Sequence, residues 1–420
     1  METYGWDTVF ATTVEHINAA LAKGQKELVT EFSFELEGYR MEGTFGAWQV
    51  VPGGAGKLLH VRLPIAKGSL TDPRKKAADL AGVSVVVEIA LQLLPASPST
   101  PLHNVLRFDL RGDSDARGVT TVRVETPAGR LDNIQQAMLK QAVPMCLMAN
   151  AAAITFVLSS VDMVQPGSGS ALAPVQSSFY YAELDDKRAF FSMLSVSDAR
   201  SITGLDRKID PTLLSASETG FYAMAPDLLM RAVVLPMLPK LFPGTNASMF
   251  KFNPQARSVQ NTSAFATPSV HSGALDYVPI VNSLLLTPFN DGIACSVTGS
   301  CDMGLGIQCT FGVHAQNKLV FDGRTRSLGF ARDANPTVTH DFSIPWYDYL
   351  IPGILGIGDG ILALVVDLVA NGIADGLQRA SADFSLARDA PQSVRWAGME
   401  SCQLESAGMA NAFFMRGKLV

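Results

Sequence analysis

The chain has 420 residues, which is enough for two or three domains. Its net charge of −6 argues against a general nucleic-acid binder, which would carry a basic surplus. Only 17% of the residues are charged, against about 25% in an average globular chain, and 47% are hydrophobic. This apolar surplus indicates large cores, sheets buried on both faces, protein interfaces or a cavity for an apolar ligand.

The N-terminal residues predict an amphipathic helix that packs on the rest of the protein. Asp7 would lie in its first turn, near the positive end of the helix dipole, and Gly24 stands where the helix could end. One apolar stripe follows from the spacings of four, four, three and four residues between Trp6, Phe10, Val14, Ile17 and Leu21.

The same residues do not form a secretory signal, because no Lys or Arg precedes Lys23 and acidic residues interrupt every apolar run. The five cysteines include no CxxC pair, so neither a zinc site nor a disulfide framework is predicted. We therefore expect a soluble, cytoplasmic protein, with export by a non-classical route left open.

Antiparallel strands follow the first helix. Apolar and polar residues alternate over 32–36, 85–93 and 106–110, as they do in half-buried strands. The turn cluster Pro52-Gly53-Gly54-Ala55-Gly56 joins two such runs, 45–51 and 59–65, into a predicted hairpin. From Leu131 the period becomes helical, and strands return between 258 and 328.

Two blocks of strands and apolar helices are therefore expected, with a Pro/Gly/Ser loop near residue 165 between them. We predict two helix and curved-sheet modules, 1–165 and 166–420, which are able to share strands. Helices that do not alternate with strands indicate an α+β fold. A sheet that covers a long helix such as 344–377 has to curve around it, which would give an elongated body with an apolar seam between helix and sheet.

No membrane span is predicted. Residues 141–161 carry no formal charge and are long enough to cross a bilayer, but Pro144, Asn150 and several alanines favour a buried helix, kinked or broken at Pro144. Acidic residues shorten every charge-free run between 344 and 377.

Motifs of catalysis are absent from the sequence. The run Gly53-Gly54-Ala55-Gly56-Lys57 lacks the Ser or Thr of a P-loop and is better explained as a hairpin turn. The six histidines are scattered singly. We predict no catalytic residue, no metal ligand and no cofactor.

Three segments together resemble the P-47/OrfX family of accessory proteins, which are encoded beside botulinum neurotoxins. They are Tyr4-Gly5-Trp6-Asp7, the block GTFGAWQVVPGGAGKLLHVRLPIAKGSL and Trp346-Tyr347-Asp348-Tyr349-Leu350. The resemblance implies a tubular lipid-binding (TULIP) architecture, in which long helices are wrapped by strongly curved antiparallel β-sheets. It also implies lipid ligands, with phospholipids including phosphoinositides as candidates, and no catalytic residues. The opening segment would then be the first turn of a helix.

We favour a non-enzymatic protein that binds a phospholipid, a fatty acid or another apolar small molecule. The apolar lining would come from the helix over 344–377, through Trp346, Leu350, Ile354, Ile357, Ile361 and Leu364. Arg74, Lys75 and Lys76 form the sharpest basic cluster and could contact an anionic headgroup, although a solvated loop is the plainer explanation. Two alternatives stay open: an interaction protein with a filled seam that acts with homologous partners, and a cyclase or isomerase that uses the cavity as a reaction chamber.

Overall fold

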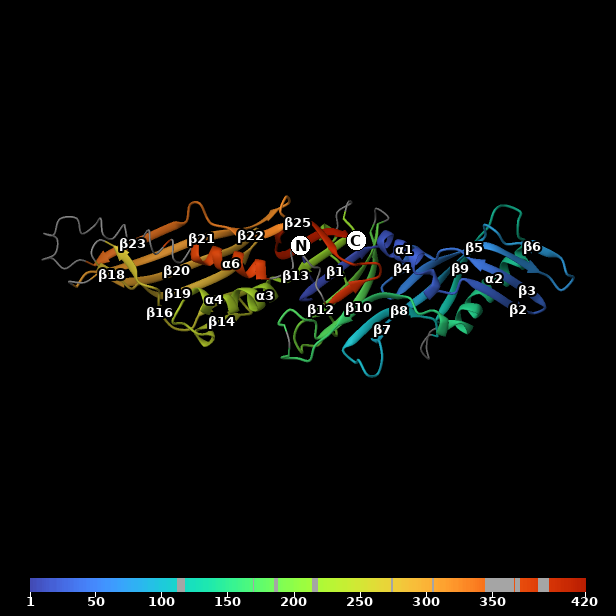
Figure 1. The fold of residues 1–420 in the computed structure, drawn as a ribbon, viewed down its shortest axis with the longest axis horizontal. Helices are drawn as coiled ribbons and strands as arrows, with labels where there is room; N and C mark the ends of the chain where they lie inside the picture. Colours follow the sequence, from blue (N-terminus) through green and yellow to red (C-terminus); the bar gives the residue numbers. More distant parts are fainter. Residues whose placement is uncertain are drawn as a thin grey trace. The chain divides into compact units, whose positions relative to one another are not determined.

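The computed structural model describes residues 1–111, 118–168, 170–184, 188–213, 218–272, 275–303, 306–343, 366, 371–383 and 393–420. They form a mixed structure that is mostly antiparallel sheet with few helices, as the α+β expectation required (Figure 1). The chain divides into two compact units. The larger unit contains Tyr4–Phe221, Pro391–Gln403 and Lys418–Val420, and the smaller unit contains Met1–Thr3, Tyr222–Ala390 and Leu404–Gly417. Residue 165 lies within the larger unit, and the two predicted modules stay a prediction.

One sheet of ten described strands dominates the larger unit. Its strands follow the order β2-β3-β5-β7-β8-β10-β24, with β4 and β6 paired to β5 and β9 paired to β7. The bounds are β2 Glu31–Leu36, β3 Tyr39–Phe45, β4 Gln49–Ala55, β5 Leu58–Thr71, β6 Ala77–Asp79, β7 Ser84–Pro95, β8 His103–Asp109, β9 Val119–Glu125, β10 Val157–Asp162 and β24 Val394–Trp396. The alternating runs predicted from the sequence are thus strands, because their apolar sides are buried: Val85, Val87 and Ile89 are fully inaccessible to solvent.

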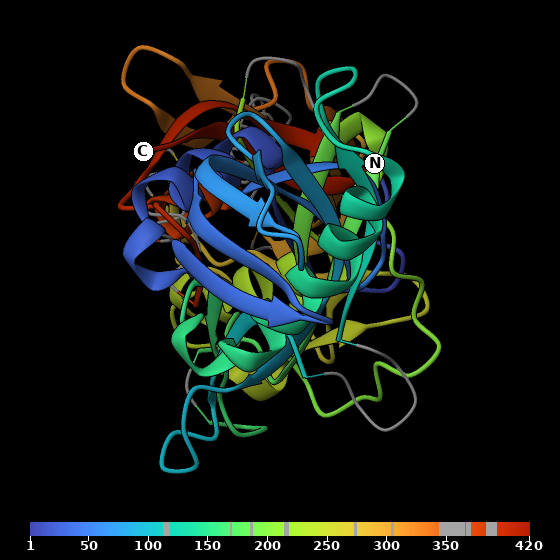
Figure 2. The same ribbon diagram turned by 90° about the vertical axis from the view of Figure 1, so that its right-hand side faces the viewer.

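The remaining elements of the larger unit are three more strands and the helices. β1 (Thr8–Thr13) pairs with β12 (Ala189–Val196), which pairs with β11 (Gln176–Glu183), all antiparallel. The helical segments are α1 Val14–Lys23, η1 Gln25–Glu27, α2 Asn133–Ala149, η2 Ala151–Ala153 and η3 Pro211–Leu213. Helix α2 lies on the outside of the unit in the foreground of Figure 2 and packs on β9.

The N-terminal helix is shorter than predicted. Thr8–Thr13 form strand β1, and α1 begins only at Val14, where the Thr13 side chain caps the helix by accepting a hydrogen bond from the backbone N–H of His16. Four of the six residues of β1 are β-branched, and such residues favour a strand over a helix. The predicted apolar stripe nevertheless identifies buried side chains correctly: all five of its residues are buried, namely Trp6, Phe10, Val14, Ile17 and Leu21.

The segment Tyr4-Gly5-Trp6-Asp7 is therefore not the first turn of a helix, which corrects that expectation. Tyr4 and Gly5 have positive φ and turn the chain into β1. The Trp6 side chain is 1% exposed, and its Nε1–H donates to the carbonyl of Asp206 at 2.8 Å. The segment anchors the N-terminal chain inside the larger unit.

The glycine-rich run belongs to a hairpin, as predicted: Gly53, Gly54 and Ala55 end strand β4, and the chain turns at Gly56 and Lys57 into β5. Gly53 has φ +121°, and a Cβ atom at this position would lie 2.1 Å from Nδ1 of His60. The backbone N–H groups of Gly53 and Gly54 donate to the same Oε1 of Glu183, at 2.6 and 3.1 Å. The Glu183 carboxylate therefore already accepts from the backbone N–H groups that a phosphate would need.

The uncharged segment 141–161 begins in a helix, as predicted, but the helix is not broken at Pro144 and does not extend to residue 161. The helix continues through Pro144 to Ala149, and residues 157–161 belong to strand β10. Only one side of α2 is buried, through residues such as Leu139, Val143 and Leu147. None of the helices in the described ranges is long and apolar enough to cross a membrane.

The smaller unit contains a second antiparallel sheet. Its strands follow the order β14-β15-β19-β20-β21-β22, with β16 paired to β19 and β23 paired to β21, while β17 and β18 pair with each other. The bounds are β14 Phe250–Asn253, β15 Ser258–Asn261, β16 Phe265–Ala266, β17 Val270–Ser272, β18 Leu275–Tyr277, β19 Ile280–Phe289, β20 Gly292–Asp302, β21 Gln308–Asp322, β22 Ser327–Ala331 and β23 Thr337–Ser343.

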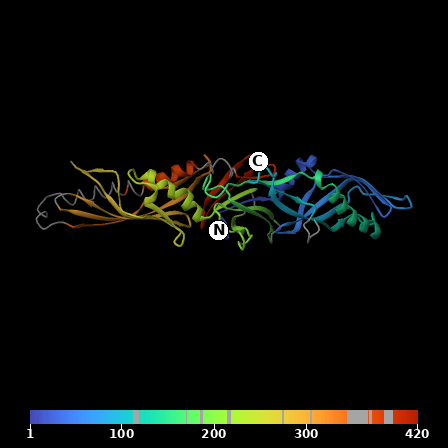
Figure 3. The same cartoon turned by 90° about the horizontal axis from the view of Figure 1, so that it is seen from below.

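Short helices pack on this second sheet. They are α3 Pro226–Leu229, the π-helical η4 Met230–Val234, α4 Leu235–Leu241, η5 Ala247–Met249 and α6 Gly372–Asp383. Helices α4 and α6 lie side by side (Figure 3), and they approach closely where Gly376 meets Leu241. The strands β13 Gly220–Met224, β25 Cys402–Ala410 and β26 Ala412–Leu419 have residues in both units.

Most of the expected long helix over 344–377 lies outside the described residues. This includes all six residues expected to line a ligand seam, namely Trp346, Leu350, Ile354, Ile357, Ile361 and Leu364. Trp48 is a core residue: its side chain is 1% exposed, and its ring centroid lies 5.9 Å from that of Phe108.

Candidate functional site

A cleft opens in the larger unit where strands β8 and β10 separate. The two strands are paired from Asp162 back to Val157, which lies opposite Arg107. Before Val157 the chain turns away, because the backbone N–H groups of Thr155 and Phe156 both donate to the carbonyl of Glu27, at 2.9 and 3.2 Å. Strand β8 continues without that partner, and the space between the diverging chains is the cleft.

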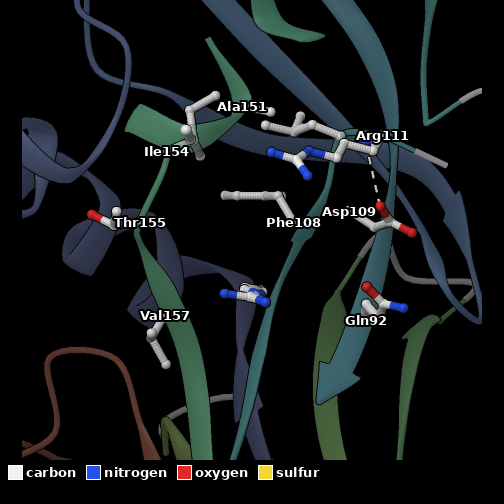
Figure 4. A pocket seen from close by; sticks show the side chains of 11 residues that line it. Gln92, Phe108, Asp109, Arg111, Ala151, Ile154, Thr155 and Val157 are labelled. Atoms are coloured by element: carbon white, nitrogen blue, oxygen red, sulfur yellow. Dashed lines mark hydrogen bonds between the residues drawn. The ribbon is translucent and has the colours of Figure 1, made fainter. Parts of the chain in front are cut away.

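The cleft has a volume of about 500 Å³, within the range of small-molecule sites. Strand β7 contributes one residue, β8 and its extension contribute five, and the η2–β10 connection contributes the rest. They are Gln92, Arg107, Phe108, Asp109, Leu110, Arg111, Ala151, Ala152, Ile154, Thr155 and Val157. Figure 4 shows Phe108 entering the cleft from one side, with Ile154, Thr155 and Val157 on the other.

One part of the lining is apolar and firmly held. Phe108, Leu110 and Ile154 are buried side chains, and the ring of Phe108 packs against Trp48. Trp48 is itself fixed by the bond from its Nε1–H to the carbonyl of Val29, at 3.3 Å. The apolar part of the cleft is therefore preformed, and it would shelter hydrocarbon without a rearrangement of the core.

The polar part of the lining is cationic. Arg107 lies between Gln92 on β7 and Val157 on β10, and Arg111 follows two residues after Asp109. The backbone N–H of Arg111 donates to Oδ1 of Asp109 at 3.3 Å. Within the described ranges neither the Arg107 nor the Arg111 guanidinium forms an ion pair, so two cations and one carboxylate line the opening.

This set of groups is suited to binding. Guanidinium groups bind phosphate and carboxylate through paired N–H donors. The lining includes neither histidine nor cysteine, and Asp109 is its one carboxylate. In the part of the chain that the structure describes, no three side chains of the metal-ligating types come together.

The predicted headgroup residues lie elsewhere in the larger unit. Arg74, Lys75 and Lys76 are exposed in the turn between β5 and β6, and none of them lines the cleft. The Asp72 carboxylate holds this turn by accepting from the backbone N–H of Lys76 at 2.8 Å, and Lys75 has φ +64°. The turn is ordered, and it presents three cations to solvent.

Sequence reasoning missed the cleft because it used only the buried side of β8. The alternation of Leu106, Phe108 and Leu110 identified the strand, while Arg107 and Arg111 on the other side received no role. Two arginines at the end of a strand were the available signal. Ala151 and Ile154, forty or more positions further on, have no comparable signal in the sequence.

The fold and the cleft together define a β-rich protein with a preformed cleft of small-molecule size. Residues 3–380 match the model of the OrfX-like family, described as protein OrfX2/OrfX3/P47, and the chain belongs to this family. Protein P47 from Clostridium botulinum (strain Kyoto / Type A2) is 23% identical over 369 residues, covering 84% of this chain and 85% of its own. Protein OrfX3 from Paraclostridium bifermentans is 22% identical over 342 residues, covering 72% and 70%.

Two solved structures share the fold. P47 from Clostridium botulinum A2 has a TM-score of 0.82 at 20% sequence identity, with 100% of this chain and 98% of that chain covered. P47 of Clostridium botulinum E1 has a TM-score of 0.78 at 19% identity, with 99% and 100% covered. At these identities the likeness concerns the fold alone.

Proposed function

We propose that this chain is a non-enzymatic lipid-binding protein whose cleft between β8 and β10 takes an anionic headgroup. The phosphate or carboxylate would lie between Arg107 and Arg111, and the first carbons of the lipid would contact Phe108 and Ile154. The observation that carries this proposal is that one cleft of about 500 Å³ combines a buried apolar wall with two guanidinium groups, neither of which is ion-paired within the described ranges. A wholly polar ligand would gain nothing from contact with the apolar lining of Phe108, Leu110 and Ile154.

The finer architecture is part of the same proposal. We take the fold to be TULIP-like, with the segment 344–377 as a helix that forms an apolar seam with the sheets. In this arrangement Trp346, Leu350, Ile354, Ile357, Ile361 and Leu364 would contact acyl chains, each buried methylene contributing about 0.8 kcal/mol before ordering costs. The exposed turn of Arg74, Lys75 and Lys76 would add a weaker, solvent-screened attraction for anionic lipids.

The arginine cleft can be tested by exchange of its charges. Each charge-assisted hydrogen bond is worth about 1.5–3 kcal/mol, so Arg107→Gln with Arg111→Gln should weaken binding of dodecanoate or dihexanoyl phosphatidic acid at least tenfold. A matched control is Arg324→Gln with Arg395→Gln, which removes the same charge from two exposed positions outside the cleft. Unchanged affinity in the cleft variant, measured by calorimetry, would refute the assignment.

A second candidate is an interaction protein that acts with homologous partners and has its seam filled by side chains. Membership in a family that includes OrfX2, OrfX3 and P47 favours it, because related chains are candidate partners. Native mass spectrometry of the purified protein separates the two: co-purified lipid supports the first proposal, and its absence, together with no uptake of added fatty acid, supports the second.

A further inference from the structure

Helix α2 has an apolar face on the outside of the larger unit. Ile134 is 60% exposed, and Met145 and Met148 are each 38% exposed. Their separations of eleven and three residues place them on one side of the helix, which also carries the uncharged Gln141 and lies opposite the side that buries Leu139 and Val143. We call Ile134, Met145 and Met148 the α2 stripe, and its length is about 21 Å at 1.5 Å per residue.

The neighbouring strand enlarges this apolar surface. Val122 on β9 is 40% exposed at a register shift in the β7–β9 ladder. Next to it, the Thr121 hydroxyl donates to the backbone carbonyl of Lys140 on α2 at 2.7 Å, which fixes the strand against the helix. Four of the nine large hydrophobic side chains that are strongly exposed in the described part of the chain therefore lie on α2 and β9.

The charge of the helix identifies what could cover this surface. Lys140 is the one charged residue between positions 133 and 156, so the segment offers no carboxylate. The outer face of a helix exposed to water is normally polar and charged. Nearby carboxylates are engaged at their own sites: Asp132 caps the helix by accepting from the backbone N–H of Gln135 at 2.8 Å, and Glu125 is paired with Arg62.

The α2 stripe also leads to the arginine cleft. After α2 the chain continues through Asn150 into η2, where Ala151 and Ala152 line the cleft together with Arg107 and Arg111. An uncharged apolar helix face that adjoins a pair of cations matches the boundary between acyl chains and anionic headgroups in a bilayer. A protein partner with an acidic surface would match the arginines but not the stripe.

We propose that α2 is a membrane-docking face. The stripe enters the boundary between headgroups and acyl chains of an anionic bilayer, and Arg107 and Arg111 meet the headgroup phosphates. This inference rests on the proposed function, because the bilayer is the source from which the cleft takes its lipid.

The test is flotation of the full chain with vesicles of phosphatidylcholine and phosphatidic acid. Wild-type protein should float, and Met145→Glu with Met148→Glu should reduce the bound fraction at least tenfold, because the carboxylates would have to enter an apolar, negatively charged boundary. The control, Val278→Glu with Val320→Glu, adds the same charge to two exposed hydrophobic positions of the smaller unit and should float like the wild type.

A soluble lipid separates this proposal from the proposed function. Met145→Glu/Met148→Glu should bind dihexanoyl phosphatidic acid like the wild type, whereas Arg107→Gln/Arg111→Gln should lose both activities.

If the methionine variant floats like the wild type, or if the wild type binds only the soluble lipid, membrane docking is overturned and the cleft stands. If the stripe proves to be a dimer contact, shown by a change from dimer to monomer in the methionine variant without any vesicle binding by the wild type, docking is also overturned. Vesicle binding that depends on the methionines, without binding of the soluble lipid, supports docking and overturns the cleft assignment.

Discussion

The Asp7 carboxylate and the Arg200 guanidinium form an ion pair of 2.7 Å between residues that are 193 positions apart. Asp7 is 3% exposed, and its second oxygen accepts from both the backbone N–H and the hydroxyl of Ser197, each at 2.8 Å. Nη2 of Arg200 also donates to the carbonyl of Gly5 at 3.1 Å. These bonds explain the carboxylate at the start of the chain, because it fastens the N-terminal segment to the β12 side of the larger unit.

Asp7→Asn should lower the free energy of unfolding of the larger unit by about 2–3 kcal/mol. Removal of one member of a buried pair costs about 3–5 kcal/mol, and the partial exposure of Arg200 reduces this figure. Urea unfolding followed by circular dichroism measures the change. Asp206→Asn is the control, because its partner Lys208 is exposed and surface pairs contribute at most about 1 kcal/mol. Equal effects of the two substitutions would contradict the anchoring role of Asp7.

Trp6→Asp should destabilise the whole larger unit by at least about 3–5 kcal/mol. The substitution removes a buried aromatic ring and the bond to the Asp206 carbonyl, and it buries an unpaired charge. Trp6→Phe should cost less, since the ring volume is largely kept. A melting temperature that is unchanged in Trp6→Asp would show that the N-terminal segment is not docked.

Gly53→Ala should be more costly than an ordinary glycine substitution at positive φ. The new Cβ would lie 2.1 Å from the His60 ring, so the hairpin would have to shift in addition to bearing backbone strain. We expect a loss of more than about 2 kcal/mol, against about 1 kcal/mol for Gly129→Ala, where φ is +73° and the space is open. Chemical unfolding of both variants measures the difference, and similar losses would mean that the imidazole contact has no role.

His16 should make stability depend on pH. Burial lowers the pKa of His16 from its ordinary value of 6.5, against the opposing effect of its bond to the Ala397 carbonyl. Because the unfolded chain binds the proton more readily, the stabilisation is complete above pH 6.5 and is lost as the pH falls through the lower folded pKa. Relative to His16→Gln, the wild type should therefore lose stability as the pH falls below about 6.5, measured by urea unfolding. Parallel pH profiles would contradict this prediction.

Neutralisation of Arg74, Lys75 and Lys76 together should weaken binding to anionic vesicles by about two- to tenfold and leave neutral vesicles unaffected. The side chains are exposed, so the effect should shrink as salt is added. Flotation at low and at physiological ionic strength measures it. An equal loss with neutral vesicles would show that the substitutions disturb the β5–β6 turn and do not remove a headgroup contact.

The sequence by itself determined the elements whose burial is periodic. Strands β5 and β7 could be predicted because alternate side chains enter one core, and a period of two is then visible in the chain. The resemblance to the P-47/OrfX family also came from local segments, and the family match agrees with it. At the N-terminus the same kind of reasoning found the buried residues but not the secondary structure. Trp6 and Phe10 are buried by a turn and a strand whose partner β12 lies about 180 positions away.

Only the tertiary structure decided the two candidate surfaces. The cleft exists because the Glu27 carbonyl draws Thr155 and Phe156 away from β8, and a hydrogen bond between such distant positions leaves no periodic signal. The exposure of Met145 and Met148 was equally hidden, since an uncharged helix in a sequence resembles a helix buried on every side. Hydrophobicity records what a side chain prefers, whereas packing of the remaining chain decides which apolar side chains find a partner and which remain at the surface.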